Sequence, residues 1–407
     1  MSGSASSNDK PINLLVATST YPRRANDPDP GFVHELCRRL ANNHIQVTVL
    51  APRAPGLAEL EVMDGVNVRR FGYFVRSAER LAYDGGILSK LRQQPWLYLL
   101  VPFFVAGLWW ALRRELRRDY DLVHAHWVVP QGLAAAWARK SRLPPLLVTL
   151  HGGDLFGLRQ WPMPSLKGRA LRASQRIAVV SQHMRDVLMR DFAAPGERIA
   201  VLPMGVDLQQ RYTIDPTEER VPGSILFVGR LVEKKGVRYL LEAFALARSS
   251  LPELTLDIAG DGPLRDELQR RASELRVNDR VRFLGPKAQA QIPTLFRRAS
   301  LAVVPSIVAD SGDQEGLGLV TIEAMGCGCP VVASDLPAIR DVVCHNETGR
   351  MAAPADASAL ADAIETAFRL PDETARLAEN ARRYVEQHFD WQQVADRYTE
   401  EIRRLAR

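Results

Sequence analysis

At 407 residues, with 46% hydrophobic and 25% charged residues, the chain has the composition of a folded globular protein and is too long for one ordinary core, so two domains are expected. The net charge of +6 suits anionic partners such as nucleotides, phospholipid surfaces or nucleic acid without choosing among them. Four irregularly spaced cysteines and a start without a basic segment and an apolar run argue against a disulfide framework and a secretory signal, which favours a cytoplasmic protein.

The first half of the chain predicts a parallel sheet covered by helices. Residues 1–10 are expected to form a disordered tail. After it, short β-branched or apolar runs alternate with longer amphipathic stretches, which is the pattern of strands and helices in an α/β domain. Strands are predicted at INLLVAT from Ile12, IQVTVLA from Ile45, VNVRRF from Val66, DLVHAH from Asp121, PLLVTLH from Pro145, RIAVVS from Arg176 and RIAVLP from Arg198.

The second half repeats this architecture after a polar linker, QQRYTIDPTEERVPG from Gln209. We therefore predict an α/β fold of two Rossmann-like, doubly wound domains facing a central cleft. The first covers 11–206, the second covers 207–387, and a last helix within 388–407 packs back on the first. In open α/β sheets ligands bind beyond the carboxyl ends of the strands, which would place the site in the cleft. Strands are predicted from Ser224, Leu254, Arg280, Ser300 and Cys329, with helices at 237–248, 263–275, 289–298, 318–326, 356–370 and 373–387.

An apolar run from Trp96 to Leu112 precedes the basic segment RRELRR. Its 17 residues reach the lower limit of the roughly 17 to 25 that span a bilayer. A spanning helix would have to end just before the strand from Asp121, which belongs to the same sheet as Ile12, so topology argues against it. Two compatible interpretations stay open: a buried helix of the first domain, or an interfacial helix whose arginines meet anionic head groups across 96–118.

The first strand and the fifth predicted strand each lead into a turn with candidate site residues. TSTYPRRANDPDPGF contains no G-x-G-x-x-G, which argues against an NAD-type enzyme. Gly31 stands where a helix begins, so it is either a phosphate-binding position or a plain turn glycine. His151 follows PLLVTLH and could bind a ligand hydroxyl, while Asp154 is a helix N-cap, a ligand-binding residue or both. His126, in HAHW, is expected to have a packing or strand-end role.

In the second half, glycines and cations follow the predicted strands. Arg230 and Lys235, in GRLVEKKG, can form a diphosphate clamp at a strand end, with solvated surface charges as the alternative. Gly260, in AGDGP, lies in a turn before a helix. Gly285, in FLGPK, repeats that geometry, and its backbone could meet a planar base.

The stretch EGLGLVTIE brackets a glycine-rich helix start with two carboxylates. The amides of Gly316, Leu317 and Gly318 are expected to be free for an anion. Glu315 and Glu323 would repel a phosphate but can accept hydrogen bonds from hydroxyls on either side of it. A nucleotide sugar has this layout, with a hexose on one side of the diphosphate and a ribose on the other.

Taken together, these motifs resemble a retaining glycosyltransferase of the GT-B fold, in glycosyltransferase family 4, the group 1 glycosyltransferases. The resemblance runs from INLLVATSTYP to the last helix, and its most specific element is EGLGLVTIEAMGCGCPVVAS; HAHW, HGGD, LPMGVD, GRLVEKKG and AGDGP agree in order and spacing. Many relatives have a glycine pair where this chain has Gly31 alone.

The resemblance implies transfer of a hexose or N-acetylhexosamine from a UDP- or GDP-sugar to a glycan or lipid-linked acceptor, as in cell-surface polysaccharide or glycolipid synthesis. It implies no cofactor and no metal, and no nucleic-acid partner is expected. The segment 96–118 and the basic charge balance are the reasons to expect a cytoplasmic protein that lies peripherally on the inner face of the membrane. A nucleotide-sugar binding protein without catalysis and an epimerase are the alternatives. The implied catalytic residues are His151, Arg230, Lys235 and Glu315; the donor-binding residues are Gly31, Arg230, Lys235, Gly260, Gly285, Glu315, Gly316, Leu317, Gly318 and Glu323; and Asp154 lies on the acceptor side.

Overall fold

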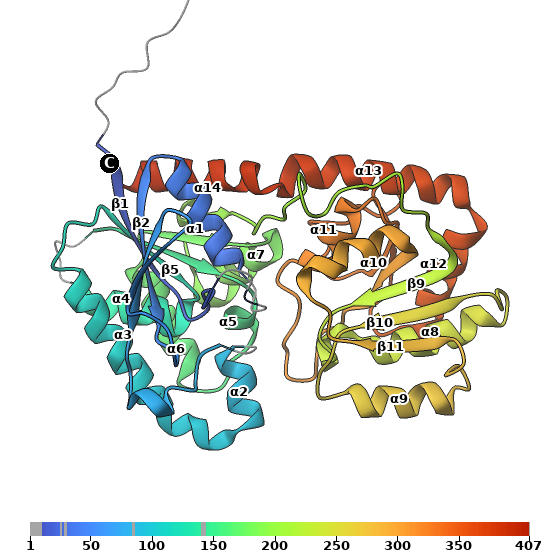
Figure 1. The fold of residues 1–407 in the computed structure, drawn as a ribbon, viewed down its shortest axis with the longest axis horizontal. Coiled ribbons are helices and arrows are strands. Elements are labelled where there is room, and N and C mark those ends of the chain that lie inside the picture. Colours follow the sequence, from blue (N-terminus) through green and yellow to red (C-terminus); the bar gives the residue numbers. More distant parts are fainter. Residues whose placement is uncertain (1–9, 25–26, 28–30, 84–85, 140–143, 407) are drawn as a thin grey trace, which may run out of the picture. The chain divides into compact units, whose positions relative to one another are not determined.

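The computed structural model describes residues 10–24, 27, 31–83, 86–139 and 144–406, and Figure 1 traces the chain through them. It divides the chain into two compact units. The first comprises Met1–Val179, Val187–Leu202 and Ala395–Arg407, and the second comprises Val180–Asp186 and Pro203–Val394. The expected tail, 1–10, lies outside the described residues apart from Lys10.

The first unit is built on an eight-stranded sheet in the order β3-β4-β2-β1-β5-β6-β7-β8. Neighbouring strands are parallel except for the antiparallel pair β3 and β4. The strand order reverses beside β1, so β1 and β5 flank the switch point at which α/β sheets bind ligands. The strands are β1 (Ile12–Ala17), β2 (Ile45–Pro52), β3 (Leu60–Met63), β4 (Val66–Phe71), β5 (Leu122–His126), β6 (Leu146–Leu150), β7 (Arg176–Val179) and β8 (Ile199–Val201).

All seven strands predicted for this half are present, and β3 is an addition that the prediction missed. The turn between β3 and β4 is Asp64-Gly65, with both residues at positive φ (48° and 80°). Asp-Gly is a strong hairpin signal, so this dipeptide could have revealed the strand. The short strand itself is weakly patterned, because it lies at the sheet edge with Leu60 and Val62 exposed.

Helices cover the first sheet, and part of the last helix belongs to this unit. α3 contacts α4, which contacts α6, while α1 contacts β2 and β4. In the last helix, α14 (Trp391–Ala406), the Tyr398 hydroxyl donates to the Leu202 carbonyl at 3.2 Å, and Thr399 accepts from the Asn43 amide at 2.9 Å. The other helices are α1 (Phe32–Asn42), α2 (Ile87–Gln93), α3 (Val101–Glu115), α4 (Leu133–Ala138), α5 (Gly153–Phe156) and α6 (Met163–Ala173); α7 (Gln182–Phe192) is divided between the two units.

The second unit has a six-stranded parallel sheet in the order β11-β10-β9-β12-β13-β14, and its switch point lies between β9 and β12. α8 contacts α9 and α12, whereas α11 contacts α10 and α13, so helices cover both faces. β14 is an unpredicted three-residue edge strand. The strands are β9 (Val221–Val228), β10 (Thr255–Ala259), β11 (Val281–Gly285), β12 (Ala299–Val304), β13 (Val331–Ser334) and β14 (Arg350–Ala352); the helices are α8 (Val237–Arg248), α9 (Arg265–Glu274), α10 (Ile292–Arg298), α11 (Leu319–Gly326), α12 (Ala357–Arg369) and α13 (Pro371–Phe389).

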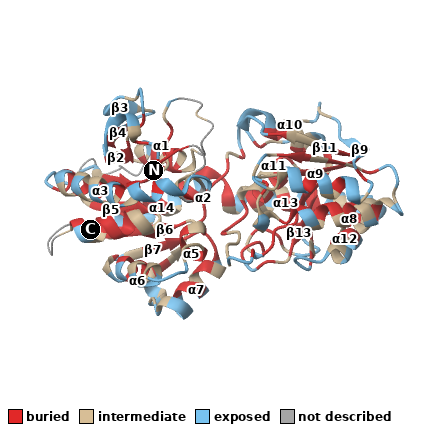
Figure 2. Cartoon of the chain, turned by 90° about the horizontal axis from the view of Figure 1, so that it is seen from below, coloured by how far each residue is buried: buried red, intermediate tan, exposed pale blue. Residues whose placement is uncertain are grey.

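Both units therefore have the doubly wound, Rossmann-like arrangement that the sequence predicts. Figure 2 shows their strands as largely buried layers between helices with exposed outer faces. Interior strands such as β5 and β6 are buried along their whole length and are mostly apolar, whereas strands nearer the edge, such as β4, alternate between buried and exposed positions. β9 begins at Val221, so the last residues of the predicted linker belong to the second sheet.

Candidate functional site

In the first unit, His151 lies directly after β6 inside a cluster of rings. Its Nε2 is 3.0 Å from Nδ1 of His126, the last residue of the neighbouring strand β5. The rings of Phe32 and Trp127 lie 5.0 and 4.9 Å from its ring. The contact with His126 shows more than the packing or strand-end role predicted from HAHW.

Burial keeps these imidazoles neutral. His126 is fully buried, and desolvation holds its pKa well below the ordinary value, with His124 and His151 as further causes. Desolvation, followed by the repulsion of His124, lowers the pKa of His151 to about 3. A neutral histidine has one donating and one accepting nitrogen, so His151 can offer a directional hydrogen bond to a ligand hydroxyl.

The structure gives Asp154 a role in holding the backbone of two strand ends. Its side chain is buried, and its carboxylate oxygens accept from the amides of His151 at 2.9 Å and Val128 at 2.8 Å. α5 begins at Gly153 with Gly152 as N-cap, so the N-cap interpretation of Asp154 is wrong. The carboxylate joins the turn after β6 to the turn after β5 and thereby fixes the position of His151.

Gly31 is the N-cap of α1, with φ −85°. Among the described residues, a Cβ built on it would meet only Pro22 Cγ at 3.7 Å, so nothing described there requires a glycine, and a phosphate-binding role for Gly31 stays a prediction. The neighbouring residues 28–30, which include part of the DPD segment, lie outside the described part of the chain.

In the second unit, Lys235 and Glu315 form an ion pair at the carboxyl ends of β9 and β12, with Nζ 3.1 Å from Oε1. Burial would raise the pKa of Glu315, but the nearby cations of Lys235 and Lys234 lower it below its ordinary value. Gly236 makes this proximity possible, since it has φ 64° and its Cα lies so close to the Pro305 carbonyl that a Cβ would come within 1.8 Å of that oxygen.

The turn from Glu315 into α11 presents unpaired polar groups. Within the described part of the chain, the amides of Gly316, Leu317 and Gly318 have no hydrogen-bond acceptor. Gly318, the N-cap of α11, has φ 86°. The hydroxyls of Ser306 and Thr321 are also buried without a partner among the described residues. Buried polar groups are normally paired, so this concentration at the end of β12 and the start of α11 indicates a ligand site.

Glu323 lies on α11, and the Tyr212 hydroxyl hydrogen-bonds to its carboxylate. Burial raises the pKa of Glu323 to about 7, while the Tyr212 bond and Lys235 act in the opposite direction. Tyr212 is itself buried, although it belongs to the segment predicted as a linker. No local pattern around Tyr212 signals this contact, because it depends on how the chain returns to α11.

Glycines form the ends of β9 to β11. The Gly229 amide donates to the Ala259 carbonyl, and the Gly260 amide donates to the Gly285 carbonyl at 2.9 Å. A Cβ on Gly260 would come within 1.8 Å of the Gly229 carbonyl oxygen, so the chain here has no room for a side chain. Arg230 follows at the exposed end of β9. Gly285 is buried and its carbonyl accepts from Gly260, so the structure does not show the exposed backbone predicted there, and binding of a donor base at Gly260 and Gly285 stays a prediction.

The structure thus gathers the predicted residues into two sets. Arg230, Lys235, Glu315 and Glu323 lie at strand ends and the first helix turns of the second unit, and His151 and Asp154 lie together in the first. The described residues contain no group of three His, Cys, Asp or Glu suited to a metal ion. Asp313, in the acidic stretch DSGD at 310–313, pairs with Lys234 at 3.2 Å.

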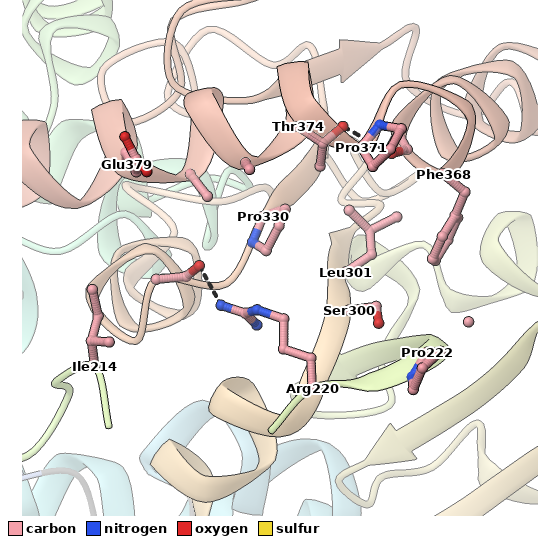
Figure 3. A pocket seen from close by; sticks show the side chains of 15 residues that line it. Ile214, Arg220, Pro222, Ser300, Leu301, Pro330, Phe368, Pro371, Thr374 and Glu379 are labelled. Atoms are coloured by element: carbon pink, nitrogen blue, oxygen red, sulfur yellow. Dashed lines mark hydrogen bonds between the residues drawn. The ribbon is translucent and has the colours of Figure 1, made fainter. Parts of the chain in front are cut away.

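A cavity of about 460 Å³ lies elsewhere in the second unit (Figure 3). It is lined by Pro222, Ser300 and Pro330 at the amino ends of β9, β12 and β13, and by residues of α12 and α13. Arg220 at its wall donates to the carbonyl of Gly328 at 2.6 Å. This is the end of the sheet opposite the predicted residues, so the cavity is separate from them.

Family models match both halves of the chain. Residues 32–210 match the model described as Glycosyltransferase Family 4, and residues 216–384 match Glycosyl transferases group 1. The D-inositol 3-phosphate glycosyltransferase of Rhodococcus jostii is 31% identical over 404 residues, which cover 91% of this chain and 83% of that protein. The glycogen synthase of Mycobacterium tuberculosis is 32% identical over 284 residues, which cover 68% of this chain and 66% of that protein, just under two thirds.

Solved structures show the same fold. Sucrose-phosphate synthase from Thermosynechococcus elongatus superposes with a TM-score of 0.76 at 23% identity, covering 97% of this chain and 99% of that one. HepE of Anabaena, solved with UDP and glucose, superposes with a TM-score of 0.71 at 22% identity, covering 97% and 100%. At these identities the likeness establishes the GT-B fold, in agreement with the two doubly wound sheets.

Proposed function

This chain belongs to the group 1 glycosyltransferases of glycosyltransferase family 4, and on that premise we propose that it moves a hexose or N-acetylhexosamine from a UDP- or GDP-sugar to a glycan or lipid-linked acceptor, with retention at the anomeric carbon. The proposal includes a role in cell-surface polysaccharide or glycolipid synthesis. It rests above all on the cluster of Lys235, Glu315, Glu323 and the unpaired amides of 316–318 in the second unit.

This cluster has the groups that a nucleotide sugar needs. The ammonium of Lys235, together with Arg230 and the amides of 316–318, provides positive charge for a diphosphate. Glu315 provides a carboxylate for the hydroxyls of the sugar, and Glu323 provides one for the ribose. A free phosphate has no hydroxyl groups to donate to the carboxylates of Glu315 and Glu323, so a nucleotide sugar explains the arrangement better.

Charge development in the reaction fits the same groups. When the bond from the anomeric carbon to the diphosphate oxygen breaks, its electron pair stays on the nucleoside diphosphate, where Arg230, Lys235 and the amides stabilise it. The acceptor oxygen bonds to the anomeric carbon on the same face, and its proton passes to the leaving phosphate. We assign no general base to the protein, and His151 binds a hydroxyl of the transferred sugar. Because the protein supplies the positive charge, we propose that no metal ion is required.

The donor is the part of the proposal with comparative support. HepE, of the same fold, is solved with UDP-glucose as well as with UDP and glucose, and this favours UDP among the candidate nucleotides. We expect UDP or GDP at a hundred times its Kd to add about 2.7 kcal/mol to the free energy of unfolding. A thermal-shift panel of UDP, GDP, ADP and their sugars measures this, with Lys235→Ala as the variant that loses the shift.

Product analysis with the donor found in that panel separates the alternatives. A transferase hydrolyses the donor slowly alone and consumes it faster with acceptor sugars or lipids. A non-catalytic binding protein shifts its melting temperature without consuming any donor. An epimerase releases an isomerised sugar when no acceptor is present. Absence of a thermal shift with every nucleotide would contradict the proposal at its first step.

We further propose that the protein is cytoplasmic and lies peripherally on the inner face of the membrane through the segment 96–118. Pro95–Glu115 is long and apolar enough to cross a membrane by length and composition. However, Phe104, Leu108 and Leu112 on α3 are buried, and the Phe104 ring packs on the ring of Tyr73 at 5.0 Å. β5, which follows, is an interior strand of the sheet. One face of α3 is therefore occupied by protein, which does not fit a span.

The opposite face of this segment suits a membrane surface. The apolar side chains of Leu99, Phe103 and Trp110 are 73%, 50% and 65% exposed. Phe103, Trp110 and Arg114 share one face of α3 by their spacing, Arg117 follows just beyond the end of the helix, and both arginines are exposed. Aromatic rings followed by arginines on one face are typical of helices that lie in the interface of an anionic bilayer.

Membrane binding is tested by flotation with vesicles. Wild type is expected to float with anionic vesicles and much less with zwitterionic ones. Because a basic residue near an anionic surface contributes about 1 kcal/mol, Arg114→Glu with Arg117→Glu should lower binding by about tenfold or more. Phe103→Ser with Trp110→Ser should lower it for both vesicle types. Trp161→Ser removes a tryptophan outside the segment that is even more exposed, at 88%, and should have no effect. Equal flotation of all four proteins would rule the surface out.

A further inference from the structure

We propose that His126 is a positioning residue that holds His151 as the tautomer with its proton on Nδ1, so that His151 meets the donor sugar as a hydrogen-bond donor. The inference rests on the proposed function and specifies how His151 acts in it. It starts from the 3.0 Å contact between His126 Nδ1 and His151 Nε2. The ring planes differ by 20°, and the centroids lie 5.2 Å apart, much further than the two nitrogens. The rings therefore meet edge to edge, as a hydrogen bond requires.

The unpaired nitrogen of His126 decides the direction of this bond. His126 Nε2 is buried without a partner among the described residues. A proton on Nε2 would leave a buried N–H unpaired, whereas a proton on Nδ1 leaves only a lone pair unpaired. Orphaned buried N–H groups are the rarer and costlier case. His126 Nδ1–H therefore donates to His151 Nε2, and the neutral ring of His151 carries its proton on Nδ1.

A second imidazole supports His126 from behind. The His124 ring lies 4.2 Å from the His126 ring, and His124 Nε2 is 2.7 Å from Thr149 Oγ1. The same reasoning applies to His124, whose Nδ1 is buried and unpaired in the described chain: its Nε2–H donates to the Thr149 hydroxyl. Both rings are fully buried. Because the two neutral rings pack against each other, the His126 ring is held in one position, with its proton on Nδ1.

The ring of His151 cannot easily turn over and exchange its nitrogens. Phe32 and Trp127 pack against it, and the Asp154 carboxylate holds its backbone amide. His151 Nδ1 makes no hydrogen bond with the described residues, so its N–H is available to a ligand oxygen. A proton on Nδ1 also means that His151 cannot accept one there. This agrees with a reaction in which the leaving phosphate, rather than His151, receives the acceptor's proton.

The test begins with NMR of the ligand-free, ¹⁵N-histidine-labelled protein, since two-bond correlations report which ring nitrogen carries the proton. We expect His151 protonated at Nδ1 and bare at Nε2. In His126→Leu, the Nε2 partner is lost, and we expect the Nε2–H form of His151 to become populated. A wild-type His151 protonated at Nε2 would overturn the proposal, and so would an unchanged tautomer in His126→Leu.

Kinetics separate positioning from a general structural role. Asparagine carries an N–H at a position similar to Nδ1 of histidine, whereas glutamine carries it near Nε2. We therefore expect kcat to fall about tenfold in His126→Leu and His126→Gln, as for one lost hydrogen bond, with the Kd for nucleoside diphosphate unchanged and kcat largely restored in His126→Asn. Equal losses of kcat in the Asn and Gln variants, at matched melting temperature, would contradict the proposal.

If His126→Leu does not fold, the wild-type spectrum and the comparison of His126→Asn with His126→Gln decide the question. The spectrum needs no transfer activity, so failure of the proposed function would be recognised separately.

Discussion

Glu323→Gln is expected to weaken binding of the nucleoside diphosphate by about tenfold to a hundredfold. Glu323 is the carboxylate that we propose binds the ribose, and hydrogen bonds to a charged group contribute about 1.5 to 3 kcal/mol. Since 1.4 kcal/mol corresponds to a factor of ten, loss of the ribose contacts gives this range. Isothermal titration with UDP and GDP measures the change.

Glu315→Gln is expected to have the opposite profile. It should not weaken nucleoside diphosphate binding, because the variant removes a competitor for Lys235 without removing the cation, and it should lower sugar transfer by about a hundredfold. Glu267→Gln, on the exposed face of α9, makes the same charge change in the same unit and should affect neither quantity. If Glu315→Gln lost nucleotide binding and Glu323→Gln kept it, the two assignments would have to be exchanged.

The raised pKa of Glu323 adds a pH dependence that checks the same assignment. A carboxylate accepts hydrogen bonds from ribose hydroxyls when it is ionised, so affinity should be highest above pH 7 and fall as the pH drops below about 7. The diphosphate also titrates, so the measured quantity is the difference between wild type and Glu323→Gln, which lacks the carboxyl group. Tyr212→Phe removes a bond that lowers this pKa and should move the midpoint to higher pH.

Gly236→Ala should be among the most destabilising single substitutions in the second unit, at more than about 4 kcal/mol. The new Cβ would come within 1.8 Å of the Pro305 carbonyl oxygen and 2.9 Å of its carbon, and both atoms are backbone at the end of β12. They cannot move without displacing the strand. Chemical denaturation followed by circular dichroism measures the free energy of unfolding.

Gly285→Ala is the matched control, because it separates strain from collision. Gly285 also has positive φ, 68°, but a Cβ there would meet only Arg265 Nη1 at 3.8 Å. The left-handed conformation alone costs about 1 to 2 kcal/mol for an alanine. Equal stability losses in the two variants would show that the contact between Gly236 and Pro305 is looser than the structure shows.

The sequence could predict the parts of this fold that depend on local patterns. The β-branched and apolar runs give twelve of the strands, most clearly the interior ones that are buried on both faces, and α8 begins and ends where its amphipathic pattern does. His151, Lys235 and Glu315 follow from their places after strands. What could not be predicted depends on partners far along the chain. Tyr212 reaches Glu323 across more than a hundred residues. The bond of His126 requires knowing that β5 and β6 are neighbours.

The ion pair between Lys235 and Glu315 has a consequence for the release of product. In the proposed function, a complete donor occupies both partners, because its diphosphate takes the ammonium and its sugar takes the carboxylate. Once the sugar has left, the nucleoside diphosphate would hold Lys235 alone and Glu315 would lose its ligand. Return of the ammonium to Glu315 would then compete with the phosphate, so we expect the spent nucleotide to bind less tightly than the donor, which favours turnover over product inhibition.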